Sequence, residues 1–130
     1  MLPRSNSDSE PYIKAPEFFF KELGYLHDAR INEIGWDPVQ RAVALLVNDL
    51  YANFVGFPEY EGSQPVQLIM SDVCRIQIDV TPDRFALRIM DFEVEEPGSG
   101  LHIYVKVRLD PSGFIRVECN SIACRAIRTA

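Results

Sequence analysis

The sequence predicts a mainly β fold of the α+β class, with one N-terminal helix packed on about six or seven mostly antiparallel strands. From residue 66 to residue 122, apolar and polar residues alternate, and clusters of turn-forming residues interrupt the alternation. A period of two gives each strand one buried face and one solvated face. Sequential hairpins of this kind form a meander, a half-barrel or a two-layer sandwich.

The 130 residues are expected to form a single domain over residues 16–125. A chain of this length buries roughly 65–70% of its unfolded surface, so it needs neither a metal nor a disulfide to fold. Residues 1–15 are expected to be a flexible tail without the apolar core of a signal peptide, and residues 126–130 are expected to fray. No stretch approaches the roughly 20 apolar residues of a membrane span, so a cytoplasmic protein is expected.

The net charge of −6 argues against non-specific nucleic-acid binding, which depends on basic residues that neutralise phosphates. The charge either attracts a basic partner or simply keeps a small domain soluble. The three cysteines are Cys74, Cys119 and Cys124, and their spacing is not that of a zinc site. We therefore expect no metal and no cofactor. Cys74 shares its parity with Ile76 and Ile78, which predicts that it is a small core residue.

The only good helix candidate covers residues 17–26, with Pro16 in the first turn, where its missing N–H costs nothing. Apolar residues recur there near helical spacing, and Gly24 weakens or ends the helix. We expect a short helix that lays its phenylalanines on a sheet. The apolar positions are Phe18, Phe19, Leu23 and Leu26.

The first strands are expected as a hairpin of residues 29–36 against residues 41–48, joined by a turn at Asp37-Pro38. Residues 51–65 follow as a long loop, close to the upper length for an unstructured loop in a compact domain. Residues 66–80 are expected as a long strand or a bent pair, with a kink at Ser71-Asp72.

The remaining strands are expected to be joined by a turn at residues 81–84, a loop at 96–100 and a turn at 111–113. The strand that begins after residue 84 has apolar residues at odd positions and then at even positions. One apolar face cannot change parity without an inserted residue, which predicts a β-bulge near Ile89–Asp91. The odd set is Phe85, Leu87 and Ile89, and the even set is Met90, Phe92 and Val94.

His27 and Asp28 are the only adjacent pair of a histidine and an acid, in which a carboxylate could orient an imidazole for catalysis. Adjacent residues on a strand point to opposite faces, so a structural role is favoured. Asp28 would accept backbone N–H groups where the helix ends, and His27 would cap the helix C-terminus. His102 is expected to lie exposed on the polar face of its strand. We assign no catalytic residue.

Two sets of residues are candidates for binding a partner. Alternating carboxylates at Asp91, Glu93 and Glu95 would form an acidic strip, or would pair with Lys106 and Arg108 on the next strand. Aromatic residues in the 51–65 loop are typical of interface anchors, and equally of a loop that docks on its own sheet. The aromatic residues in question are Tyr51, Phe54, Phe57 and Tyr60.

A His-Asp-Ala segment at residues 27–29 leads into the first predicted hairpin. The same comparison includes the residues around this segment and a pair near the C-terminus, which are Leu26, Arg30, Ile31, Ile34, Trp36, Asp37, the strand end Val47-Asn48-Asp49-Leu50 and Glu118-Cys119. In these residues the chain resembles a group of small uncharacterised bacterial domains, some of them similar to immunity proteins encoded beside polymorphic toxins. The resemblance implies an all-β or α+β binding domain without catalysis, and it transfers no catalytic residue.

Together these observations favour a non-enzymatic, immunity-like binding module that presents the acidic strip and the aromatic loop to a basic protein. A homodimer formed through strand edges or exposed aromatic residues is the second hypothesis. The third is a small-molecule or enzymatic site in a barrel mouth lined by Tyr104, His102 and Trp36, using His27 or His102. We expect neither nucleic acid nor a membrane as a partner.

Overall fold

The computed structural model describes residues 12–81, 87–96 and 102–127. This part of the chain contains one α-helix, two 3-10 helical turns and eight antiparallel strands, which confirms the mainly β class with a helix packed on a sheet. In chain order the elements are α1 (Pro16–Glu22), η1 (Gly24–Leu26), β1 (Arg30–Asp37), β2 (Ala42–Val47), η2 (Ala52–Phe54), β3 (Val66–Ser71), β4 (Arg75–Asp79), β5 (Leu87–Glu95), β6 (Ile103–Asp110), β7 (Phe114–Cys119) and β8 (Ser121–Ala126).

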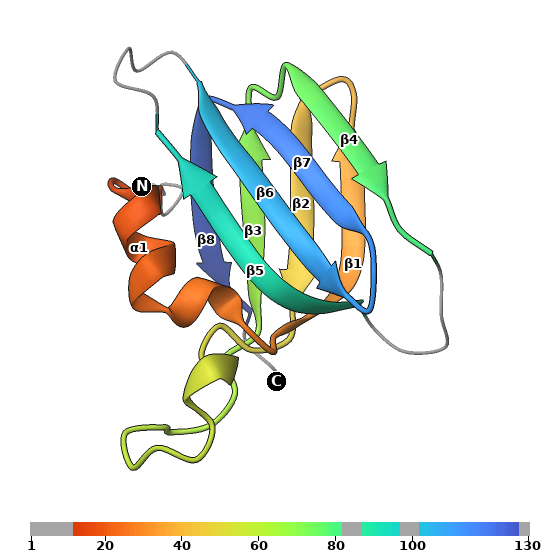
Figure 1. Ribbon diagram of the computed structural model, residues 1–130. Coiled ribbons are helices and arrows are strands. Elements are labelled where there is room, and N and C mark those ends of the chain that lie inside the picture. Colours follow the sequence, from red (N-terminus) through yellow and green to blue (C-terminus); the bar gives the residue numbers. More distant parts are fainter. Residues whose placement is uncertain (1–11, 82–86, 97–101, 128–130) are drawn as a thin grey trace.

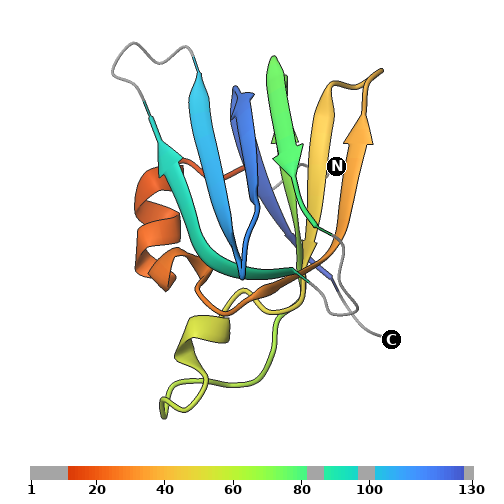
Figure 2. The ribbon, with the colours of Figure 1, turned by 45° about the vertical axis from the view of Figure 1, so that its right-hand side comes forward.

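The strands form one sheet in the order β4-β7-β6-β5-β1-β2-β3-β8, and this sheet folds on itself into two layers (Figures 1 and 2). The first four strands of that order make one layer and the last four make the other. The layers are joined where β5 pairs with the start of β1, at Arg30–Arg88 and Ile31–Leu87. The arrangement is a sandwich, one of the three architectures that sequential hairpins allow.

At the opposite corner the chain passes twice between the layers, from β3 to β4 and from β7 to β8. The kink predicted at Ser71-Asp72 is confirmed, since Asp72 has a φ of 54°. The long strand predicted at residues 66–80 is divided into β3 and β4, and the stretch after residue 113 is divided into β7 and β8. The structure therefore has more strands than expected. The corner also turns Val73 inward and leaves Cys74 exposed, so the prediction that Cys74 is a core residue is wrong.

The core fills the space between the layers, and alternate strand positions supply it as the period of two predicts. Strands β2 and β6 lie in opposite layers, and each contributes three buried side chains, which are Val43, Leu45, Val47, Val105, Val107 and Leu109.

The β-bulge predicted in β5 is confirmed by a register shift between Ile89 and Asp91 against β6. It lets Ile89 and Phe92 both be fully buried although their positions differ in parity.

A second register shift, which the sequence reasoning did not predict, lies in β1 between Ile31 and Glu33. After it, Trp36 lies opposite the buried Val43, and so Trp36 belongs to the inner face of its layer.

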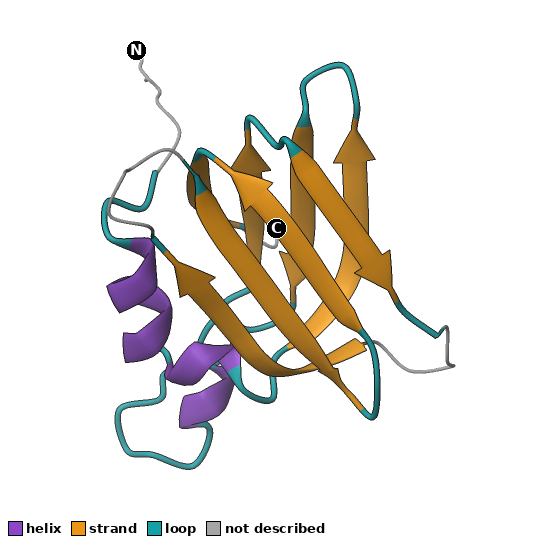
Figure 3. Cartoon of the chain, turned by 45° about the horizontal axis from the view of Figure 1, so that its top comes forward, coloured by secondary structure: helices purple, strands orange, loops and turns teal. Residues whose placement is uncertain are grey.

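Helix α1 is shorter than predicted and ends at Glu22, before Gly24. Gly24 has a φ of 65°, and a Cβ there would lie 2.1 Å from the side-chain nitrogen of Asn53, so this position requires glycine. Figure 3 shows α1 beside the sheet. Only Phe20 of the three phenylalanines is fully buried, with its ring 4.5 Å from that of Phe92, whereas Phe18 is 62% exposed.

Defined contacts of the chain extend past both expected domain boundaries. Tyr12 forms a bridge with Ala123, within the segment 1–15 that was expected to be a tail. Strand β8 includes Ala126, and the N–H of Ile127 donates to the carbonyl of Pro65, within the segment 126–130 that was expected to fray. The predicted turn at residues 81–84 and the loop at 96–100 fall largely outside the described residues.

Candidate functional site

The 51–65 loop is tied to the sandwich by Asp49, the one buried charged side chain among the described residues. Its Oδ1 accepts the N–H groups of Tyr51 and Gln64, each at 3.0 Å, and its Oδ2 accepts the hydroxyl of Tyr60 at 2.6 Å. The hydrogen bond to this carboxylate raises the pKa of Tyr60. All three donors belong to the loop, so one side chain holds it at three points, together with the main-chain hydrogen bond from the N–H of Leu50 to the carbonyl of Gln64.

Beyond this anchor the loop projects from one end of the sandwich (Figure 1). Tyr51 is 42% exposed and Phe57 is 53% exposed, and the Phe57 ring lies 6.1 Å from that of Phe54. Tyr60 is half-buried and donates to Asp49. Each interpretation of the loop aromatics therefore describes part of the set: Tyr60 docks the loop on its own sheet, and Tyr51 and Phe57 are left to solvent.

The exposed loop aromatics continue into the exposed side of α1. A hollow of about 560 Å³ is bordered by Tyr51, Phe54 and Leu23, and a second hollow of about 640 Å³ is bordered by Leu23 and Phe18. Leu23 belongs to both, so helix and loop present one continuous apolar region. We call this region the helix–loop surface. Phe18, Leu23, Tyr51 and Phe54 border the two hollows, and Phe57 adjoins them through its ring contact with Phe54.

Carboxylates surround the helix–loop surface. Glu59 and Glu61 border the first hollow and Glu22 borders the second, and all three side chains are exposed. Lys14 is a basic residue at the rim of the second hollow. The surface thus combines apolar anchors with a mainly acidic rim, an arrangement that complements a protein with apolar and basic residues.

The acidic strip lies on the outer face of β5. Asp91 forms an ion pair and hydrogen bonds with Arg108, and Glu95 forms an ion pair with Lys106 at 3.7 Å. Asp91 raises the pKa of Arg108, first through the hydrogen bond and then through its charge. Glu93 lies between them, opposite Lys106. The strip is therefore largely compensated by β6, so its field is weaker than the sequence suggests.

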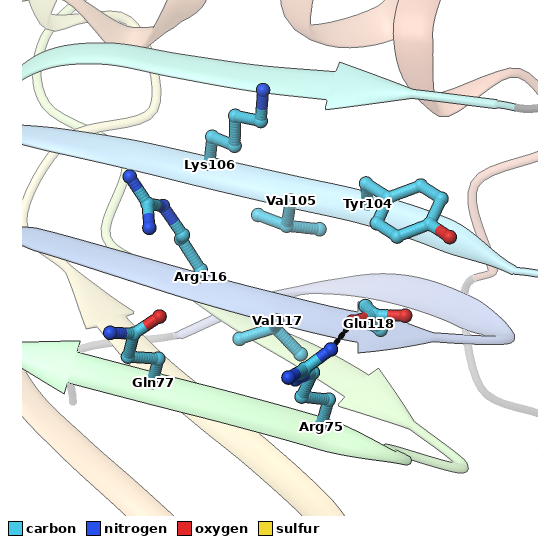
Figure 4. Close-up of a pocket in the computed structure, with 8 residues that line it drawn as sticks. All are labelled: Arg75, Gln77, Tyr104, Val105, Lys106, Arg116, Val117 and Glu118. Carbon is cyan, nitrogen blue, oxygen red and sulfur yellow. Dashed lines mark ion pairs between the residues drawn. The ribbon is translucent and has the colours of Figure 1, made fainter.

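The outer face of β4, β7 and β6 carries a third hollow, of about 300 Å³ (Figure 4). Figure 4 shows the side chains of Arg75 and Glu118 pointing toward each other, and the two form an ion pair at 3.6 Å. Arg116 lies over the ring of Phe114, with its guanidinium carbon 4.3 Å from the ring centroid. These charged groups have partners on the protein itself, which indicates a solvated strand face.

His27 and Asp28 tie the exit of η1 to β5. The Nδ1 of His27 donates to the carbonyl of Met90 at 2.9 Å, and its Nε2 lies 3.6 Å from Asp28 Oδ1. Asp28 in turn pairs with Arg88 at 3.6 Å. The two side chains are neighbours, as a functional pair requires, but the imidazole faces a main-chain carbonyl and the carboxylate faces a guanidinium. These contacts differ from the capping that was expected, and they hold two elements together.

His102 contacts Cys74, which the sequence gave no reason to expect, with Sγ 3.8 Å from Nδ1. Tyr104, His102 and Trp36, which are expected to line a barrel mouth in the third hypothesis, do not come together. Tyr104 lies on the outer face of β6 (Figure 4), whereas Trp36 lies on the inner face of β1 in the other layer. The space between the layers is filled by the core, so that arrangement is wrong.

Among the residues that the structure describes, no group of three or more His, Cys, Asp or Glu side chains could hold a metal ion. In the same part of the chain, no helix has the length and apolar character needed to cross a bilayer.

The thiols are expected to differ sharply in reactivity. Burial raises the pKa of Cys119 to about 12 and that of Cys124 to about 11, whereas Cys74 is exposed. Because the thiolate is the nucleophile, iodoacetamide at pH 8 should modify Cys74 in the native protein and the other two only after unfolding. Peptide mass mapping of native and urea-treated samples measures this order, and equal labelling of all three native thiols would contradict it.

Comparison of the chain with protein-family models finds no match. Comparison with curated proteins finds none either. Among solved structures, the chain is similar to an uncharacterized protein from Neisseria gonorrhoeae, with a TM-score of 0.53 and 15% sequence identity over 75% of this chain and 90% of that one. At this level of identity the similarity concerns the fold alone: the two chains share the arrangement of their strands.

Proposed function

We propose that this chain is a non-enzymatic protein-binding module that contacts a basic partner protein through the helix–loop surface. The observation that carries the proposal is the exposure of aromatic side chains on a loop that a buried carboxylate holds in place. Aromatic side chains supply large contact areas with few rotatable bonds, and a loop that is already ordered loses little further entropy on binding.

The charge distribution supports a basic partner. The chain carries a net charge of −6, and Glu22, Glu59 and Glu61 surround the apolar anchors. Complementary charges raise the association rate, while burial of the aromatic anchors slows dissociation. The acidic strip of Asp91, Glu93 and Glu95 is a secondary contact in this proposal, because Lys106 and Arg108 already compensate much of its charge.

The resemblance of residues 26–50 to immunity-protein-like domains supports an inhibitory role, in which the module covers a basic surface of a toxin-like protein. Within this proposal the protein acts in the cytoplasm, which its three unpaired cysteines favour. A toxin-like reading frame next to the gene would support this form of the proposal.

The helix–loop surface is tested by binding measurements with matched variants. The partner is captured from native lysate at low salt, identified and purified, and its Kd is measured for each variant. Phe18→Ser and Phe57→Ser should each weaken binding by about tenfold or more, as hot-spot truncations do. The control is Val39→Ser, which changes an 87% exposed apolar residue in the β1–β2 turn.

The control should bind as wild type does. Absence of any partner at low salt, or equal Kd values for Phe57→Ser and Val39→Ser, would count against the helix–loop surface as the binding site.

An enzymatic or small-molecule role through His102 is the second candidate, and the contact between Cys74 and His102 favours it. If His102 activates Cys74 as a nucleophile through this contact, alkylation of Cys74 should be slower in His102→Ala than in the wild type. Equal alkylation rates in the wild type and His102→Ala would leave the binding module as the better account.

A further inference from the structure

The two edge strands of the sheet differ in how they are covered. At β8, Tyr12 bridges Ala123, and the N–H of Ile13 donates to the carbonyl of Ile122 at 2.9 Å. Strand β4 pairs with β7 along one edge, and no other strand of the described chain pairs with its second edge. An unpaired edge presents backbone N–H and C=O groups to which a further strand can add.

The side chains of β4 do little to prevent such an addition. Strand β4 contains no proline and no lysine, and its two charged side chains, Arg75 and Asp79, are not at the inward positions. Its inward positions are Ile76 and Ile78, which lie opposite the buried Val117 and Ile115 of β7. Ile78 is nevertheless 39% exposed, because nothing in the described chain lies beyond the edge. The edge therefore leaves apolar surface that an added strand would cover.

The sequence of β4 is complementary to itself in the antiparallel direction. It reads Arg-Ile-Gln-Ile-Asp, so a pairing centred on Gln77 places Arg75 of one copy opposite Asp79 of the other and Ile76 opposite Ile78. Opposite charges that face each other across antiparallel strands stabilise the pair, and like charges destabilise it. A two-fold axis makes each favourable pairing twice.

We propose that this chain forms a homodimer in which β4 pairs antiparallel with β4 of a second copy, centred on Gln77. The layer that contains β5, β6, β7 and β4 then continues into the same layer of the partner. Arg75 is 80% exposed beside Glu118, so its guanidinium is accessible to the second copy. In Figure 1, β4 lies on the side of the molecule away from α1, so the dimer leaves both helix–loop surfaces open.

Charge reversal gives a direct test of the register. Arg75→Asp would set carboxylates opposite each other at both positions, and Asp79→Arg would set guanidinium groups opposite each other. Each variant alone should therefore dimerise at least tenfold more weakly than wild type. An equimolar mixture of the two variants restores opposite charges at both positions, and it should form a heterodimer.

Sedimentation velocity from about 5 µM to about 500 µM covers the micromolar range of weak association. Both altered side chains are exposed, so the variants should keep the wild-type circular dichroism. Glu33→Lys, an exposed charge reversal on β1, is the control and should dimerise normally. A wild-type chain that stays monomeric, single variants that dimerise like wild type, or a folded mixture that does not associate would each overturn the proposal.

One further variant distinguishes self-association through β4 from self-association through the helix–loop surface. Phe57→Ser should leave self-association unchanged while it weakens partner binding. If Phe57→Ser abolishes self-association, the copies meet through the helix–loop surface, and the β4 proposal fails while the binding surface stands.

Discussion

Replacing Phe20 by alanine should lower the free energy of unfolding by about 3–5 kcal/mol, the usual loss when a buried phenylalanine is truncated. Phe20 is fully buried, and its ring packs 4.5 Å from that of Phe92, which is also fully buried. The substitution removes a ring contact between α1 and β5 and leaves a cavity lined by the remaining side chains. A loss of this size is a large share of the 5–15 kcal/mol that stabilises a typical domain. Urea unfolding followed by circular dichroism measures it.

Phe18→Ala is the matched control, since it makes the same chemical change two residues earlier on the same helix. Phe18 is 62% exposed, and its truncation should change the free energy of unfolding by less than about 0.5 kcal/mol. Phe18→Ala should nevertheless weaken partner binding, because Phe18 belongs to the helix–loop surface. Similar stability losses for both would contradict the orientation of α1 described above.

Replacing Asp49 by alanine should cost about 3 kcal/mol, because it leaves the hydroxyl of Tyr60 and the N–H groups of Tyr51 and Gln64 without their acceptor. The loop can limit this loss by opening and exposing the donors to water, so the damage should be local. Hydrogen exchange should therefore accelerate at Tyr51 and Gln64 while the amides of β6 keep their protection. Uniformly faster exchange over the whole chain would show that Asp49 supports the sandwich rather than the loop.

Asp49→Asn provides the isosteric control and should lose less than the alanine variant, because the amide keeps one acceptor oxygen. The Tyr60 hydrogen bond adds a pH test. Its pKa is raised above the ordinary value of 10.0, so the folded state holds this proton more tightly than the unfolded state. The resulting stabilisation is complete below about pH 10 and is lost as the pH rises through the folded pKa. Tyr60→Phe should remove this part of the alkaline decline in stability, measured as Tm against pH.

Phe20→Ala and Asp49→Ala distinguish the effect of domain stability on partner binding from the effect of loop order. Phe20→Ala should weaken partner binding because α1 carries Phe18 and leads into Leu23, and it should also destabilise the whole domain. Asp49→Ala should weaken binding through loss of loop order alone, since Tyr51 and Phe57 remain present but are no longer held. A partner that binds Asp49→Ala as tightly as wild type would show that loop order does not matter for recognition.

Patterns that are local in the chain predicted local structure well. The change of apolar parity in β5 placed a bulge near Ile89–Asp91, and the register against β6 contains it. The same reasoning applied to Ile31, Ile34 and Trp36 would have found the bulge in β1, because those apolar residues also change parity. Parity failed at Cys74, since it assumes a continuous strand and Asp72 turns the chain at the corner.

The candidate site was predicted only in part. Aromatic residues in an irregular segment marked the loop, but the sequence could not say which of them are exposed, because that depends on an anchor. Asp49 acts as this anchor through Gln64, which is 15 residues away. One of the two interpretations of the acidic strip was that its charge is compensated by the next strand. The register of β5 on β6 decides this, because it places Asp91 and Glu95 beside Arg108 and Lys106.

Alternation of apolar and polar residues by itself determined that the chain forms antiparallel strands with one buried face. Successive side chains of a strand point to opposite faces, so the apolar residues are buried together only when that one face is turned to the core. The tertiary structure alone decided how those strands close into a sandwich, which edge is left uncovered and where helix and loop form a common surface. These features depend on contacts between residues far apart in the chain, such as Phe20 with Phe92, and no local pattern encodes them.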